Sequence, residues 1–548
     1  MLGCSAQILS AIVFSPAYGS VGYYAPVIRS YADKLTAPVG HPSRKVKVHR
    51  VKPLRALLVS AFATLLMMGG CATRPVNPPI TAYIPGKGYQ FQTRQQYSFD
   101  RQNLVVLAFS GGGTRAAAFS YGVLEALRGI EIVGPKGAKF RLLDEVDVIT
   151  GVSGGSFTAL AYGLYGDKLF DEYERRFLKR NVQGELTARA LNPLNWGALS
   201  SNGWGRSELA AQLYDEILFN GATFADLDRG RGPMIEVMAT DLSTGSRVAF
   251  DQGTFNVLCS DLSAVPLSRA AATSSAVPVV LSAVTFNNYG GTCNYGTPDW
   301  LRPFTNSPDV PRPAARAVQR LKELESFQDS VKRPYLHLVD GGVSDNLGLR
   351  GVLDIVEVFQ ALHAAGQPTP FDHVHRIIVF VVNSLSSPET DWDQSENPPN
   401  TVETLVKATG VPIDRYSYEA VEQLKDVAAQ WKMLRRIRDT PAFAANKDPT
   451  LGEVVNAPDI GLYVIDVSFA ALKDKAEFEY LNGLPTSFVL PDEAVDRLRA
   501  AAGSIIRESP ELQRLLKDAG AKVVSHASGA AATSDVSTPT SESSMTAE

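Results

Sequence analysis

The sequence has few cysteines, no visible internal repeat and no apolar run long enough to cross a membrane comfortably. None of its four cysteines, Cys4, Cys71, Cys259 and Cys293, has metal-ligand spacing, which excludes the common cysteine-rich metal sites. An apolar run at residues 56–68 is shorter than the roughly 20 residues that a spanning helix needs. The absence of a repeat excludes solenoid and propeller architectures.

Basic residues outnumber acidic ones only in the first part of the chain. Residues 1–70 hold eight Lys/Arg and one acid, Asp33, a net charge of +7, whereas all 548 residues carry −4. The remainder therefore carries −11, which argues against nucleic acid as the main partner. With 45% hydrophobic and 20% charged residues the composition is that of a globular protein, and the length suits two or three domains or one large α/β domain with additions.

The basic excess belongs to a predicted targeting signal. A basic region followed by the apolar run 56–68 is typical of such signals, and its basic residues are Arg44, Lys45, Lys47, Arg50, Lys52 and Arg55. Gly69-Gly70-Cys71 follows and resembles the bacterial lipoprotein signal, in which the cysteine is lipidated; Met68 departs from that pattern. Ala72 resembles the class directed to the outer membrane. The alternatives are a secretory signal cut near Ala72 or an uncut anchor.

We therefore expect an outer-membrane lipoprotein that faces the periplasm and meets the membrane surface through its lipid anchor; the alternative is a secreted or soluble periplasmic protein. Residues 1–43 fit no signal and are interpreted as an upstream extension. If Cys4 is upstream and Cys71 is lipidated, Cys259 and Cys293 remain as a pair. In an oxidising periplasm this pair predicts one disulfide, the alternative being two buried free thiols.

Residues 146–165, VDVITGVSGGSFTALAYGLY, have the order strand, tight turn and helix. Within them, Gly151 to Gly155 match G-x-S-x-G, the nucleophile elbow, in which a strained turn exposes a serine hydroxyl. The following helix directs its N–H groups and positive dipole end toward that hydroxyl. Because the bare pattern also arises by chance, Ser153 is a candidate nucleophile that needs support from the rest of the chain.

A glycine-rich loop follows an earlier apolar strand at 103–109. Residues 110–115 read SGGGTR and precede a helix at 116–128. Gly111, Gly113 and Ala116 satisfy G-x-G-x-x-A, a dinucleotide fingerprint, which also requires an acid about 20 residues later at the end of the second strand. The candidates Asp144 and Asp147 lie about 30 residues past the loop and before the next strand. The second interpretation is an oxyanion hole made of backbone N–H groups at a helix N-terminus. We favour it, because the elbow lies on a strand that we expect beside this one.

The remaining strands are predicted at 233–240, 335–339, 377–382 and, last, 462–467. Asp340-Gly341-Gly342 follows one of them, at the place where open α/β sheets gather catalytic residues. Helices are expected at 262–275, at 314–331 in an exposed insertion, at 416–438, at 493–506 and at 510–517. The serine- and threonine-rich residues from 524 onward are typical of disorder.

Four motifs now stand in order: SGGGTR at 110–115, GVSGG at 151–155, SSAVP at 274–278 and DGG at 340–342. With ATDLSTG at 239–245, this set resembles the patatin-like phospholipase family over residues 104–382. The resemblance implies a three-layer α/β fold with a mostly parallel central sheet and helices on both faces, followed by a mostly helical C-terminal extension. It also implies hydrolysis of lipid esters without a cofactor or metal.

By this resemblance, Ser153 is the nucleophile and Asp340 its general base, a dyad without histidine. Gly111, Gly112 and Gly113 would form the oxyanion loop. Arg115, at the family's basic position, and Gly154 are candidates for substrate binding. Ala116 stands where the family usually has glycine. A serine hydroxyl is a weak nucleophile, and a carboxylate held partly out of water would be a stronger base for it.

Two other functions stay open. A Ser-Asp-His triad would use Ser153, Asp340 and either His373 or His375, but both histidines precede the predicted 377–382 strand, at the wrong end for catalysis. The chain could also be a non-catalytic lipid-binding lipoprotein. We predict a signal region at 1–70, a tether at 71–102, a catalytic domain at 103–383 with an insertion near 300–333, a helical region at 384–524 with one strand, and a tail at 525–548.

Overall fold

The computed structural model describes residues 72–91, 102–133, 137, 139–201, 203–229, 232–278, 280–297, 315–364, 372–390, 392–445 and 452–526. The predicted targeting signal, Cys71 and the upstream extension lie outside these residues, as does most of the predicted C-terminal tail. Among the described helices, none is both long enough and apolar enough to cross a bilayer.

The chain divides into two compact units. The smaller comprises residues 1–73 and 193–201 and contains helix α7 (Pro193–Leu199), and in it the Ala72 N–H donates to Ser201 Oγ over 3.0 Å. The larger comprises residues 74–192 and 202–548 and holds every element described below.

Five parallel strands form the centre of the main sheet. In spatial order they are β10 (Gly461–Ser468), β9 (Arg376–Asn383), β1 (Asn103–Phe109), β4 (Val148–Val152) and β5 (Met234–Asp241). All five are apolar and mostly buried, as is usual for parallel strands covered by helices on both faces. Phe109 of β1 lies level with Gly151 of β4, so the glycine loop and the elbow leave the sheet at neighbouring points.

Three antiparallel strands complete the sheet: β6 (Arg247–Ala249), β7 (Val284–Asn287) and β8 (Tyr335–Asp340). Strand β6 pairs with β5 residues 238–240, whereas β4 pairs with 234–238 and β8 with 239–241. Because a strand edge accepts one partner at a time, β6 takes one edge of β5, and β4 and β8 share the other. Their C-terminal ends meet there, with Val152 level with Met238 and Asp340 level with Ala239.

This arrangement corrects the reason for which Asp340 was expected near Ser153. The prediction assumed a parallel strand that ends at the same sheet edge, but β8 runs the opposite way. It starts beyond the end of β4 and runs back toward it, and the apolar pattern YLHLV carries no information about strand direction.

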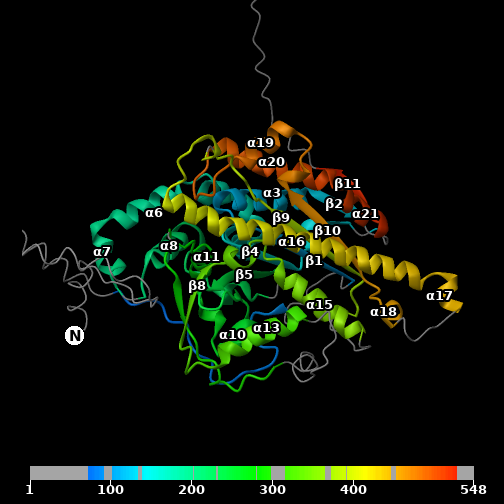
Figure 1. The fold of residues 1–548 in the computed structure, drawn as a ribbon, viewed down its shortest axis with the longest axis horizontal. Helices are drawn as coiled ribbons and strands as arrows, with labels where there is room; N and C mark the ends of the chain where they lie inside the picture. The colour runs from blue at the N-terminus through cyan, green and yellow to red at the C-terminus, as the bar shows by residue number, and fades with distance from the viewer. Residues whose placement is uncertain are drawn as a thin grey trace, which may run out of the picture. The chain divides into compact units, whose positions relative to one another are not determined.

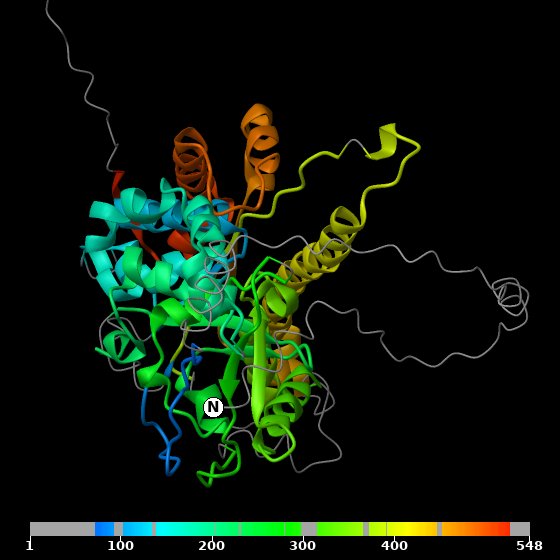
Figure 2. The ribbon, with the colours of Figure 1, turned by 90° about the vertical axis from the view of Figure 1, so that its left-hand side faces the viewer.

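Helices cover both faces of the sheet. One layer contains α3 (Gly113–Gly129), α4 (Gly154–Tyr165) and α20 (Asp492–Glu508), and the other contains α15 (Arg350–Ala364) and α16 (Thr401–Arg438). In Figure 1 the long α16 crosses in front of the sheet, with α3 and α20 side by side above it, and Figure 2 shows the same layers edge-on. The core therefore has two halves, one on each face of the sheet, as the predicted three-layer fold requires.

The remaining helices surround this frame, and a small antiparallel sheet lies apart from it. The helices are α5 (Leu169–Tyr173), α6 (Val182–Leu191), α8 (Arg206–Tyr214), α9 (Phe224–Leu227), α10 (Gln252–Val257), α11 (Leu267–Ser274), α13 (Ala315–Glu325), α14 (Gly342–Asp345), α17 (Pro441–Ala445), α18 (Gly452–Val455), α19 (Lys475–Asn482) and α21 (Pro510–Asp518). The small sheet is formed by β2 (Ile130–Val133), β3 (Lys139–Arg141) and β11 (Lys522–His526). The Cys259 and Cys293 sulfurs form a disulfide, with Cα atoms 5.5 Å apart.

Several predicted boundaries differ from the observed ones. The predicted helix 262–275 is interrupted, because Pro266 has extended backbone and α11 begins only after it. Helix α16 begins at Thr401 rather than near 416, and its first turns expose Leu405 and Val411, so no apolar stripe marks them. Strand β11 follows β10 and extends past residue 524, where the prediction expected no regular structure.

Candidate active site

Ser153 lies on a strained turn between β4 and α4. Its backbone has φ 47° and ψ −118°, in the region that side chains other than glycine rarely adopt. A β-carbon at Gly151 would lie 2.7 Å from the Cα of Ser156, and one at Gly155 would lie 2.6 Å from the Ser110 carbonyl oxygen. Only glycine therefore fits at either end of this turn, which has the geometry of a nucleophile elbow.

Asp340 ends β8 beside this turn. The Ser153 side chain lies close enough to this carboxylate to lower the pKa of Asp340, and the Gly342 N–H donates to Asp340 Oδ1 over 2.7 Å. Ser153 is 5% exposed and Asp340 7% exposed, so the pair lies almost entirely out of water. The structure thus joins two residues that are 187 positions apart in the sequence.

Burial raises the pKa of Asp340 from 3.8 to about 6. The hydrogen bond from the Gly342 N–H and the nearby Ser153 hydroxyl act in the opposite direction, because they stabilise the carboxylate. Asp340 is therefore a carboxylate at neutral pH but a stronger base than an exposed aspartate.

The SSAVP motif holds both segments in place. Ser274, the last residue of α11, accepts a hydrogen bond from the Ser153 N–H over 2.8 Å and donates to the Met238 carbonyl over 2.7 Å. The backbone carbonyls of Ser274 and Ala276 accept from the N–H groups of Gly341 and Asp340, over 3.1 and 3.0 Å. This short segment therefore bonds to the nucleophile turn, to β5 and to the end of β8.

The glycine loop lies against the elbow. A β-carbon at Gly154 would lie 2.0 Å from the Gly113 carbonyl oxygen, and one at Gly111 would lie 3.3 Å from the β-carbon of Ser153. The Gly111 N–H already donates to the Asn346 carbonyl over 2.9 Å, so it is not free to bind an oxyanion as predicted. Gly111 instead allows the loop to approach Ser153 closely. The N–H groups of Gly112, Gly113 and Gly154 precede the first intrahelical bonds of α3 and α4, where donors are open to a ligand.

Arg115 does not have the surface position that substrate binding would require. Its side chain is 3% exposed, and its Nε, Nη1 and Nη2 atoms donate to Ser384 O, Leu484 O and Thr486 Oγ1 over 2.7, 2.9 and 3.0 Å. Burial lowers its pKa to about 10, partly offset by the carboxylate of Asp414, so the guanidinium is charged at neutral pH. Arg115 was predicted to contact the substrate, but in the structure its side chain makes hydrogen bonds inside the protein.

Asn346 is a site residue that the sequence did not reveal. Its Oδ1 atom lies 2.4 Å from the position of a β-carbon on Gly111 and 2.9 Å from one on Gly342. The amide thus lies between the glycine loop and the segment after Asp340. In the sequence, Asn346 is marked only by its position six residues after Asp340. That spacing does not indicate a site until the positions of β8 and α14 are known.

The histidines that a triad would need lie at the opposite end of the sheet. The His375 N–H donates to the Gln102 carbonyl, just before β1 begins, and the His375 carbonyl accepts from Gly461, where β10 begins. Strands β4, β1 and β9 are parallel neighbours. Ser153 follows the C-terminal end of β4 and His375 precedes the N-terminal end of β9, so the two residues lie at opposite ends of the sheet. His373 precedes the same strand, β9.

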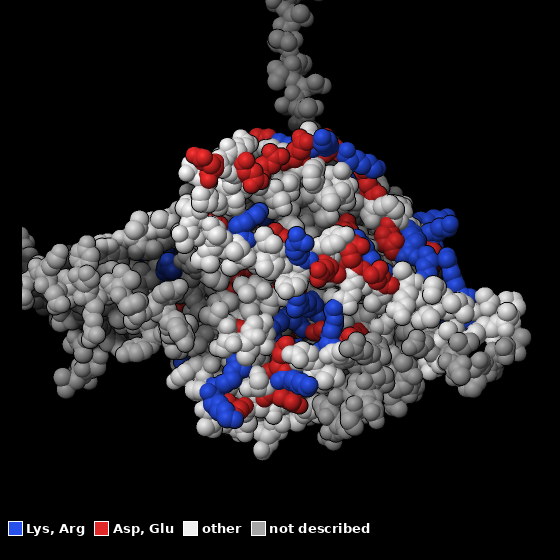
Figure 3. Space-filling view, in the orientation of Figure 1, with Lys and Arg blue, Asp and Glu red and all other residues white. Residues whose placement is uncertain are grey.

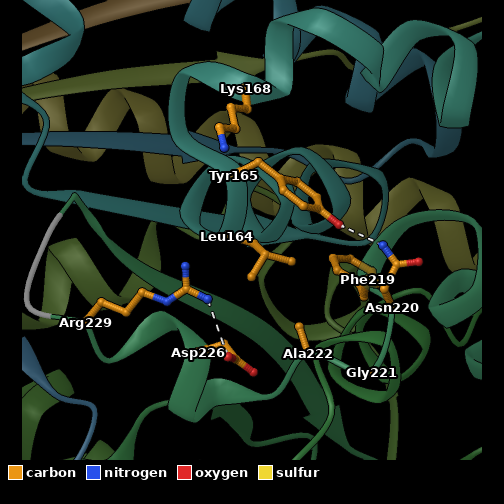
Figure 4. Close-up of a pocket in the computed structure, with 9 residues that line it drawn as sticks. All are labelled: Leu164, Tyr165, Lys168, Phe219, Asn220, Gly221, Ala222, Asp226 and Arg229. Carbon is orange, nitrogen blue, oxygen red and sulfur yellow. Dashed lines mark hydrogen bonds and ion pairs between the residues drawn. The ribbon is translucent and has the colours of Figure 1, made fainter.

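Two hollows lie near α4 and α14. One of 660 Å³ is at the end of α4 far from Ser153 (Figure 4), where Lys168 and Arg229 approach from opposite sides, and its other lining residues are Leu164, Tyr165, Phe219, Asn220, Gly221, Ala222 and Asp226. The second adjoins Asp340 and is lined by Gly342, Val343, Ser344, Asp345, Asn346, Arg350, Ile413, Tyr416, Ser417 and Ala420. The second holds only 10 Å³, and neither Ser153 nor Asp340 is among its lining residues.

An open α/β sheet with a strained serine on a strand-to-helix turn is the arrangement found in hydrolases of the nucleophile-elbow type. Residues 107–353 match the patatin-like phospholipase family. These residues form a patatin-like phospholipase domain, whose activity class is that of a lipid acyl hydrolase.

The solved structures include distant similarities. Human GIVD cytosolic phospholipase A2 has 15% identity and a TM-score of 0.38, with 82% of this chain and 69% of that chain covered. Its complex with methyl gamma-linolenyl fluorophosphonate has 15% identity and a TM-score of 0.36, with 86% and 64% covered. ExoU from Pseudomonas aeruginosa has 14% identity and a TM-score of 0.18, with 81% and 88% covered. No curated protein sequence matches the chain.

Proposed function

We propose that this protein hydrolyses ester bonds of phospholipids or related lipids in the bacterial cell envelope, with Ser153 as nucleophile and Asp340 as its base. The observation that carries the proposal is that the strained Ser153 turn and the buried Asp340 carboxylate meet at neighbouring positions along β5, with Ser153 close enough to influence the pKa of Asp340. A base within hydrogen-bond reach is what a serine needs to act as a nucleophile.

The reaction follows from these positions. As Ser153 Oγ attacks the ester carbonyl carbon, its proton passes to Asp340, and the carbonyl oxygen becomes an oxyanion. The N–H groups of Gly112, Gly113 and Gly154 are the open donors that can stabilise this charge. The C–O bond to the leaving alcohol then breaks and the alcohol takes the proton from Asp340. Water repeats the sequence on the acyl-enzyme and releases the fatty acid.

A small recess of 10 Å³ lies next to the segment that follows Asp340. Val343, Ile413, Tyr416 and Ala420 supply an apolar lining between α14 and α16, and Tyr416 is 54% exposed at its outer side. This recess has room for about one water molecule, so the lipid substrate is proposed from the family match of residues 107–353. On the face in Figure 3, acidic and basic side chains lie interspersed over the described residues, so the electrostatics of this face do not favour one head-group charge.

Product analysis tests the substrate class. Purified protein is incubated with vesicles that contain both phospholipid and triacylglycerol, and the released species are identified by mass spectrometry. We expect free fatty acid together with lysophospholipid, and no release by the Ser153→Ala variant. Release from triacylglycerol alone would contradict the phospholipid part, and release unaffected by Ser153→Ala would contradict the site.

The envelope location rests on the basic residues before the apolar run 56–68 and on Cys71. We expect the mature chain to begin at a lipidated Cys71 in the outer membrane. Mass spectrometry of the N-terminal peptide from the membrane fraction checks this. An unmodified N-terminus beyond Cys71 would contradict the anchor without affecting the chemistry.

A further inference from the structure

A segment of the C-terminal region, residues 484–488, lies across the glycine loop. We call it the C-terminal strap; it joins α19 to α20. The strap lies far outside residues 107–353, over which the family similarity extends. Nevertheless, it makes hydrogen bonds to the first turn of α3, directly after the glycine loop.

The first contact is a backbone one. The Thr114 N–H donates to the Ser487 carbonyl over 2.8 Å. A β-carbon at Gly113 would lie 2.3 Å from the same oxygen, and Gly113 has φ 60°, so both space and backbone conformation require glycine here. The strap therefore touches the glycine loop at the residues that carry the open N–H groups.

The second contact is the Arg115 guanidinium. It donates to Leu484 O and Thr486 Oγ1 in the strap and to Ser384 O in the loop after β9. Its Nη2 atom would lie 3.0 Å from a β-carbon on Gly112, so the group lies directly behind the glycine loop. A planar, forked donor can make these three bonds at once, whereas the single ammonium of a lysine cannot reproduce their geometry.

The strap is itself fixed at both ends. Ser386 Oγ donates to the Leu484 carbonyl over 2.8 Å. At the other end, Phe488 and Gln183 exchange two hydrogen bonds, and the Phe488 ring packs 5.8 Å from that of Phe157 in α4. The strap is therefore a supported element, able to set the position of what it binds.

We propose that Arg115 is a positioning residue, which clamps the glycine loop between the C-terminal strap and Ser384 and thereby holds the oxyanion donors in place. It does not bind the lipid head group. The catalytic consequence rests on the function proposed above, but the clamp itself is a statement about structure. Accordingly, the part of the chain beyond residue 383 completes the active site.

The test compares Arg115→Lys with Arg176→Lys in the full chain. Arg176 also donates to backbone carbonyls, of Ile217 and Leu218, but away from the glycine loop, so it controls for the general cost of losing an internal arginine. Steady-state rates are measured on p-nitrophenyl butyrate, which is uncharged, and on phosphatidylglycerol in mixed micelles. We expect Arg115→Lys to lower kcat about 10–100-fold on both substrates, as a misplaced catalytic group does, with KM changed less than about threefold.

Hydrogen exchange of the peptide that contains residues 110–116 tests the clamp without any reaction. We expect faster exchange in Arg115→Lys and in Thr486→Ala than in Arg176→Lys. A rate loss confined to phosphatidylglycerol would assign Arg115 to head-group binding and overturn the proposal. Unchanged kcat with unchanged exchange at 110–116 would also overturn it. If the unmodified enzyme cleaves neither substrate, the proposed function fails, and the exchange result alone decides the clamp.

Discussion

Ser153 and Asp340 reach the same point from opposite directions. Ser153 ends β4, a parallel strand whose neighbours on both sides run the same way, whereas Asp340 ends β8, which runs against β5. The first segment is followed by a full helix, α4, and the second by the four residues of α14. The comparison shows that Ser153 and Asp340, the proposed dyad, are brought together by two strands that meet end to end along one edge of β5 and by the Ser274 segment, which bonds to both.

The largest effect is expected from changing either partner of the pair. Ser153→Ala should abolish Ser153-dependent ester hydrolysis, and Asp340→Asn should lower kcat by about 10³-fold, because a general base contributes about 10²–10⁴-fold. The double variant should cost little more than the worse single one, since the two residues act as a unit. Additive losses in kcat would show instead that the two segments act independently.

Asp340→Asn, which should lower activity, should raise stability, because Asp340 is buried. Its folded pKa of about 6 exceeds the ordinary 3.8, so folding favours the protonated form. The resulting stabilisation is complete below about pH 4 and is lost as pH rises through 6. Asp340→Asn should therefore gain up to about 3 kcal/mol in unfolding free energy relative to the unmodified protein between pH 4 and pH 8. Urea unfolding at both pH values measures the gain, and a constant difference would contradict the raised pKa.

A smaller effect is expected from the segment that joins the two strands. Ser274→Ala removes the acceptor of the Ser153 N–H and leaves that buried donor unpaired, at a cost of about 1–3 kcal/mol in stability. We expect kcat to fall about 10-fold through misplacement of the turn. The control is Ser275→Ala, whose hydroxyl donates to Ala271 within α11. Equal kcat losses in the two variants would remove the special role of Ser274.

The smallest effect is expected at the other end of the sheet. A His373→Ala, His375→Ala double variant should retain kcat within about twofold, because His375 lies near the starts of β1 and β10. Ester hydrolysis by the folded variant measures this. A loss of a hundredfold or more, the scale of a lost general base, would favour the triad.

Much of the site followed from local pattern. The elbow and the glycine loop each have glycines whose space is filled by neighbouring backbone, so their motifs encode their structure directly. Strands β1, β4, β5 and β9 were predicted as apolar runs because parallel strands are buried on both faces. In each case the residues that fix the conformation are adjacent in the sequence.

What the sequence did not reveal depends on long-range placement. The direction of β8, the approach of Asn346 and the burial of Arg115 under the C-terminal strap all involve segments far apart in the chain. Arg115 illustrates this best. An arginine after a glycine loop is compatible with a ligand contact, and its internal acceptors, such as the Leu484 carbonyl, are known only from the structure. The second sheet was missed because β11 pairs with β2, almost 400 residues away.

The most direct test of the account is the rate at which a fluorophosphonate ester labels Ser153, followed by intact mass as a function of pH. The account predicts one adduct, on Ser153, that forms faster as pH rises through about 6, because Asp340 must lose its proton to act as a base. It predicts that Asp340→Asn slows labelling by at least a hundredfold and that the His373, His375 double variant leaves it unchanged. Rapid labelling of the Asp340→Asn variant, or an adduct on another residue, would contradict the account.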